Sequence, residues 1–188
     1  MRSVAEPLAG VAPEHVRAWE RHLGREVDPV ALRAELTQGS LTDAFHRTAS
    51  EQPDRPALQV GATQITHGEL DEAAARVGGW MRGRGVRAGD RVLVTGRTSV
   101  ELVLAYLGVL RAGAAMVPAD PGSTAGELAH LIADSGAVAA WADAEPLEHL
   151  HGHDLRFTAA LGELRAAAAE GEPLAPAGAS DDLSLIHI

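Results

Sequence analysis

Apolar residues along this chain follow two spacings in turn, one typical of helices and the other of strands. Spacings of three and four positions predict amphipathic helices at residues 40–52, 66–84, 98–112 and 124–134. Short apolar runs predict strands at residues 91–95, 114–117 and 138–141. One helix between each pair of strands fits right-handed crossovers, so the pattern predicts an α/β fold with a partial parallel βαβ sheet.

Three of these helices begin with the same local pattern, a threonine followed three positions later by a glutamate. The pairs are Thr66 with Glu69, Thr98 with Glu101, and Thr124 with Glu127. In this arrangement, a capping box, each side chain accepts a hydrogen bond from a backbone N–H that would otherwise lack a partner. The pattern therefore predicts three capped helix starts.

The segment before the predicted sheet has a different organisation. Residues 57–60 and 63–66 alternate apolar and polar positions around Gly61-Ala62, which predicts a β-hairpin with a type II′ turn. Two further helices are predicted nearer the N-terminus, at residues 13–24 and 28–36. They form a helical extension to which the sequence assigns no chemistry.

The periodic pattern weakens after residue 143. A helix is predicted at residues 158–170, followed by a stretch rich in proline, alanine and glycine. The chain is therefore expected to divide into three parts: a helical N-terminal extension at 1–39, an α/β domain at 40–170, and a linker with a truncated strand at 171–188.

The composition excludes several classes of function. The net charge is −10, and all sixteen basic side chains are arginines, so there is no basic stripe for nucleic acid and no lysine for catalysis. Without cysteine, the chain forms no disulfide and offers no thiolate nucleophile or ligand. No apolar run approaches the length of a membrane span, and the first ten residues do not resemble a signal peptide. A cytoplasmic protein is expected.

Glycines and one strand-to-helix corner are the candidates for phosphate binding. Gly83, Gly85 and Gly89 lie between a helix and the next strand, the reverse of a dinucleotide fingerprint, so turn and cap roles are favoured. The corner at 96–99 has the right polarity, because free N–H groups at a helix start and Arg97 would attract an anion. Ordinary capping explains this corner as well and is favoured.

Three groups of polar residues remain. His149, His151 and His153 alternate in a predicted loop and could bind zinc or nickel weakly, but a surface loop is favoured over a metal site. Asp181-Asp182 could be read as paired carboxylates, although adjacent side chains point apart. For Asp120, a turn role is favoured over ligand binding. The sequence thus predicts no catalytic, cofactor-binding or metal-binding residue.

Five segments together carry a resemblance to a known family. They are residues 52–58 (QPDRPAL), 65–70 (ITHGEL), 85–92 (GVRAGDRV), 101–121 (ELVLAYLGVLRAGAAMVPADP) and 127–136 (ELAHLIADSG). In this order and spacing they resemble the N-terminal region of adenylate-forming enzymes, and most closely that of bacterial acyl-CoA synthetases. His67 stands where the family usually has tyrosine, a difference expected to be neutral.

The resemblance implies an ATP-dependent ligase that activates a carboxylic acid as its acyl-adenylate and passes the acyl group to coenzyme A. ATP, magnesium and coenzyme A are thus the expected cofactors of a full-length enzyme. The resemblance also implies an incomplete N-terminal domain, because the family's phosphate loop normally follows a segment like 182–187 and Ile188 is the last residue. The 188-residue chain is therefore expected to bind no cofactor and to be inactive alone.

Two alternatives stay open at this point. One is a free-standing α/β binding or interaction module without catalysis, which co-purification with a stable partner would favour. The other is a small nucleotide-binding protein that uses the corner at Arg97.

Overall fold

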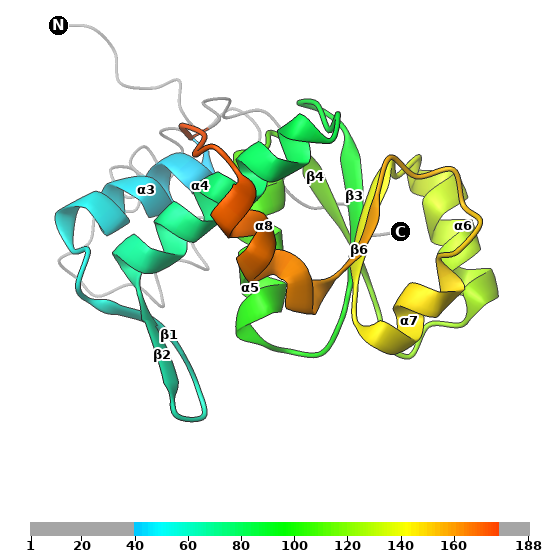
Figure 1. Ribbon diagram of the computed structural model, residues 1–188, viewed down its shortest axis with the longest axis horizontal. Coiled ribbons are helices and arrows are strands. Elements are labelled where there is room, and N and C mark those ends of the chain that lie inside the picture. The colour runs from blue at the N-terminus through cyan, green and yellow to red at the C-terminus, as the bar shows by residue number, and fades with distance from the viewer. Residues whose placement is uncertain (1–39, 177–188) are drawn as a thin grey trace, which may run out of the picture. The chain divides into compact units, whose positions relative to one another are not determined.

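A computed structural model describes residues 40–176 of the chain (Figure 1). Four strands form a parallel sheet: β3 (Arg91–Thr95), β4 (Ala115–Ala119), β5 (Ala139–Ala142) and β6 (Thr158–Ala160). Their order across the sheet is β4-β3-β5-β6, and every neighbouring pair is parallel. The predicted α/β class with a parallel sheet is confirmed. The predicted helices at 13–24 and 28–36, together with Asp181-Asp182 and the truncated strand, lie outside the described residues.

Helices cover both faces of this sheet (Figure 1). One face packs against α4 (His67–Gly83), α5 (Val100–Arg111) and α8 (Leu164–Glu170), and the other against α6 (Ala125–Ser135) and α7 (Ala144–His149). Alternate strand residues therefore enter two different cores. Val92 and Trp141 belong to the first core, whereas Leu93 belongs to the second.

Two of the three predicted capping boxes are present. Thr66 pairs with Glu69 at the start of α4, and Thr124 pairs with Glu127 at the start of α6. The third prediction is wrong, because Ser99 rather than Thr98 caps α5 and accepts a hydrogen bond from the backbone N–H of Leu102. A further box, which the pattern did not predict, joins Ser40 and Asp43 at the start of α3 (Leu41–Glu51).

The predicted hairpin is confirmed. It consists of β1 (Pro56–Val60) and β2 (Thr63–Thr66), which pair antiparallel. Gly61 has a φ of +59°, whereas Ala62 has a negative φ. A positive φ at the first central residue is what a two-residue turn beginning with glycine requires.

The end of the described chain differs from its prediction. Residues 158–170 were expected to be one helix, but β6 and the short 3-10 helix η1 (Leu161–Glu163) precede α8. The reason is tertiary: Ala159 pairs with Trp141 of β5, and this sheet hydrogen bonding replaces a helical turn. The helix α7 was not predicted, because it has only six residues.

Candidate functional site

The strand order places a topological switch point between β3 and β5. The chain leaves β3 toward α5 on one face of the sheet and leaves β5 toward α7 on the other (Figure 1). In open α/β sheets, ligands bind in the crevice outside the carboxyl ends of the strands at such a point. This edge is therefore the first place in the fold to look for a binding site.

A hollow of about 600 Å³ lies at this edge. Its lining comes from the segments that follow β3, β4 and β5 and comprises Arg97, Asp120, Pro121, Gly122, Asp143, Ala144, Glu145 and Pro146. The structure thus brings together two features that the sequence analysis considered separately, the corner at 96–99 and Asp120. We name this set of residues the carboxyl-edge hollow.

Two of the backbone N–H donors near this corner are already engaged by side chains of the chain itself. The backbone N–H of Arg97 donates to Oδ2 of Asp143 at 2.8 Å, and the N–H of Leu102 donates to Ser99 Oγ at 3.1 Å. Three carboxylates and one arginine line the hollow, so its charge is unfavourable for phosphate. Ordinary capping therefore stays the favoured prediction for this corner, and the anion site stays an untested alternative.

Asp120 performs the turn role that the sequence analysis favoured. Its Oδ1 accepts a hydrogen bond from the N–H of Gly122 at 2.7 Å, and its backbone carbonyl accepts one from Thr95 Oγ1 at 3.0 Å. These bonds fix the turn after β4. The Asp120 side chain is thus engaged in local structure.

The residues that could hold a metal ion do not converge. His149 ends α7, and His151 and His153 lie in the turn that follows. Within residues 40–176, no group of three or more His, Asp or Glu side chains is arranged to bind a metal. The absence of a metal-binding residue from this chain stays a prediction.

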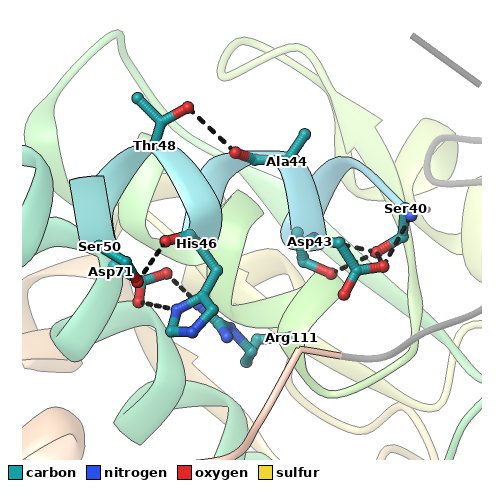
Figure 2. Close-up of polar contacts among 9 residues, drawn as sticks. Ser40, Asp43, Ala44, His46, Thr48, Ser50, Asp71 and Arg111 are labelled. Carbon is teal, nitrogen blue, oxygen red and sulfur yellow. Dashed lines mark hydrogen bonds and ion pairs between the residues drawn. The ribbon is translucent and has the colours of Figure 1, made fainter. Parts of the chain in front are cut away.

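A buried ion pair was not anticipated from the sequence (Figure 2). Arg111 at the end of α5 is 2% exposed, and its Nη2 pairs with Oδ1 of Asp71 from α4. The other carboxylate oxygen, Oδ2, lies 2.7 Å from Nδ1 of His46 on α3. A signal was available, because Asp71 and Arg111 both fall on the apolar stripes of their helices, where a charge needs an opposite partner.

Among residues 40–176, this cluster has a histidine beside a carboxylate, and no hydroxyl of these residues is hydrogen-bonded to that histidine ring. The hydroxyls near His46 in α3 donate to helix carbonyls, Thr48 Oγ1 to Ala44 and Ser50 Oγ to His46 (Figure 2). The cluster joins the helices α3, α4 and α5 and has the character of a structural ion pair.

The start of α3 carries a further carboxylate near this cluster, Asp43. Hydrogen bonds from the backbone N–H and the hydroxyl of Ser40 lower the pKa of Asp43, and the positive charge of Arg111 adds to this effect.

A second hollow, of about 390 Å³, lies between the hairpin and the helices α4, α5 and α8. Its floor is apolar, with the buried Leu70, Val100 and Leu104, and Glu69 and Arg165 add charge. Arg165 is engaged with Glu101. The described residues that line this hollow include no nucleophile paired with a base.

Comparison with known proteins identifies the family. Residues 45–182 match the family described as AMP-binding enzyme. The chain belongs to this family of adenylate-forming enzymes. Its fold corresponds to the N-terminal portion of their adenylation domains.

This AMP-binding family chain is similar to relatives of two kinds, synthase subunits and CoA ligases. Surfactin synthase subunit 2 of Bacillus subtilis is 31% identical over 134 residues, which are 69% of this chain and 4% of that protein. A medium/long-chain-fatty-acid–CoA/3-oxocholest-4-en-26-oate–CoA ligase of Mycolicibacterium smegmatis is 35% identical over 100 residues, 53% of this chain and 18% of that protein.

Among solved structures, the nonribosomal peptide synthetase FmoA3 matches with a TM-score of 0.67 and 28% identity. The match covers 78% of this chain and 16% of that one. The chain therefore spans less than a quarter of the length of each of these three proteins. None of the helices described in residues 40–176 has both the length and the apolar character to cross a membrane.

Proposed function

We propose that this chain supplies part of the framework of an ATP-dependent enzyme that activates a carboxylate as its acyl-adenylate and then transfers the acyl group to a thiol. The observation that carries the proposal is the family match over residues 45–182, on a fold shared with adenylation domains. The chain's division at residues 39 and 170 into extension, domain and linker remains a prediction, as does a cytoplasmic location.

We further propose that the described residues act as scaffold and contact neither ATP nor the acyl group. Support comes from the carboxyl-edge hollow, where carboxylates outnumber the one arginine and the N–H of Arg97 is already bonded to Asp143. The complete absence of lysine supports it too. The chain's own contribution is to hold a parallel sheet rigid through two packed cores.

The thiol acceptor has two candidates. The mycobacterial relative is named as a CoA ligase, which supports coenzyme A, the acceptor implied by the sequence resemblance. Peptide synthetases are more common among the relatives, and they support a carrier-domain thiol within a larger assembly. A direct assay of both acceptors separates these candidates.

ATP–pyrophosphate exchange tests the proposal. The 188-residue chain and the protein expressed from its whole reading frame are assayed side by side with panels of fatty, aromatic and amino acids. We expect exchange only from the whole-frame protein, with one class of acid, followed by thioester formation on coenzyme A or on a carrier domain. Exchange by the isolated chain would contradict the scaffold role, and none from the whole-frame protein with any acid would contradict adenylation.

A further inference from the structure

The four residues that follow α8 run along the surface of α4. Residues 171–174 belong to the stretch expected to be a linker, yet the N–H of Leu174 donates to the carbonyl of Ala75 at 3.1 Å. The carbonyl of Gly171 accepts from Nη1 of Arg76 at 3.4 Å. We name residues 171–174 the strap.

Two glycines make this backbone contact possible. A Cβ on Gly79 of α4 would overlap the carbonyl oxygen of Glu172 and lie 2.9 Å from its carbonyl carbon. A Cβ on Gly171 would overlap the carbonyl oxygen of Arg76 and lie 2.9 Å from the backbone nitrogen of Trp80. All of these neighbours are backbone atoms, which cannot rotate away as a side chain can.

Side chains hold the start of the strap at the same surface. Trp80 donates from Nε1 to Oε2 of Glu170 at 3.1 Å, and the guanidinium of Arg84 lies 3.3 Å from the centre of the Trp80 ring. Arg84 also approaches Glu170 at 3.6 Å. Pro173 favours an extended backbone at Glu172, which suits a segment laid along a helix.

We propose that the strap is a conformational device: it docks on α4 through backbone contacts that need glycine at positions 79 and 171, and it opens as a local unit without unfolding the sheet. Docking fixes where the chain leaves the described domain after Pro176. A Cβ at position 79 would shift the local equilibrium toward the open strap. This inference does not depend on the proposed function.

Hydrogen–deuterium exchange followed by mass spectrometry tests the strap in the full 188-residue chain. The variant is Gly79→Ala. Its matched control is Gly83→Ala, in the same helix, where a Cβ would meet no atom within 4 Å. Peptides covering 171–176 should exchange at least about tenfold faster in Gly79→Ala and at the wild-type rate in Gly83→Ala.

The variant Leu174→Pro provides an independent test, because it removes the strap's N–H donor and leaves α4 unchanged. The variant has no amide at 174, so the readout is the remaining amides of this segment, those of Gly171, Glu172 and Ala175. These should exchange faster than in the wild type, while exchange in β3 and β5 stays at the wild-type rate. Wild-type protection of 171–176 in Gly79→Ala would overturn the proposal. So would equal acceleration in the strap and the sheet in Leu174→Pro, because the strap would then not open separately.

Discussion

The core beneath α4, α5 and α8 and the carboxyl edge of the same sheet use polar residues in different ways. In and beside the core, Arg111 and Asp71 are paired between two helices with little exposure to water. At the edge, Asp120 and Asp143 bind backbone N–H groups and shape turns. The partners differ, a side-chain charge in the core and backbone N–H groups at the edge, but in both regions the carboxylates hold structure. This includes the edge, although it is where α/β folds bind ligands.

The largest effect is expected in the core. Trp141 is fully buried and packs with Trp80 and Phe157, whose ring centres lie 5.1 Å and 5.4 Å from its own. Trp141→Ala should lower the free energy of unfolding by about 3–5 kcal/mol, because it leaves a large cavity. Urea unfolding followed by circular dichroism measures this, with the exposed Leu41→Ala as control. If Trp141→Ala lowered the free energy of unfolding by less than about 1 kcal/mol, the core would not be the region that stabilises the domain most.

Breaking the buried ion pair should have the next largest effect. Asp71→Ala leaves the Arg111 guanidinium without its carboxylate, and we expect a loss of about 3 kcal/mol in unfolding free energy. The double variant Asp71→Ala with Arg111→Met should recover part of this loss, because no buried charge remains. Urea unfolding of both variants provides the measurement. If the double variant is less stable than Asp71→Ala, the pair is not the source of the effect.

A smaller effect distinguishes the two hydroxyls at the start of α5. Ser99→Ala removes the side chain that caps the helix and should cost about 1 kcal/mol, whereas Thr98→Ala should change the unfolding free energy by less than about 0.5 kcal/mol. Thermal unfolding of the two variants compares them directly. The reverse order would restore the capping box that the sequence pattern predicts.

Acid should weaken the domain through Asp90, by an effect no larger than that of Ser99→Ala. Burial raises the pKa of Asp90, but hydrogen bonds from the N–H of Arg87 and the guanidinium of Arg156, with nearby positive charge, outweigh burial and hold the pKa below 3.8. A depressed folded-state pKa contributes stability that is present above about pH 4 and is lost as the pH falls through the folded-state value.

The measurement is urea unfolding at about pH 6 and about pH 3. Asp90→Asn should lose less stability than the wild type between these values, by up to about 1 kcal/mol for so accessible a pair. The pKa values of Asp43 and Glu127 are also lowered, so both the wild type and Asp90→Asn should still lose some stability at acid pH. An identical acid loss in both would show that the Asp90 contacts do not contribute.

Local signals predicted most of this fold. The capping boxes at Thr66 and Thr124 are formed by residues three positions apart, so they can be recognised in a single sequence. The same holds for the short apolar runs that form β3 and β5. The shift from Thr98 to Ser99 was not readable, because two hydroxyl residues stand side by side before α5 and the local sequence does not say which of them is the N-cap. The loop before them is held by a tertiary contact, in which the N–H of Arg97 donates to Asp143. The Thr158–Ala160 strand likewise depends on its partner β5.

The site could be predicted less well than the fold. The corner at 96–99 and Asp120 were each recognised, but only the strand order shows that they line one hollow. Asp143 and Glu145 were missed there, because nothing in the local sequence distinguishes a carboxylate that faces a neighbouring loop from one in water. The pairing of Asp71 with Arg111, forty positions apart, depends on how α4 and α5 pack.

Calorimetric titration of the 188-residue chain with ATP and magnesium tests the central claim, that these residues are framework without a nucleotide site. The account predicts no saturable heat of binding up to about 1 mM ATP, the weak limit of measurable affinity here. It also predicts that Arg97→Ala behaves as the wild type does. A one-to-one isotherm in the micromolar range that Arg97→Ala abolishes would contradict the account.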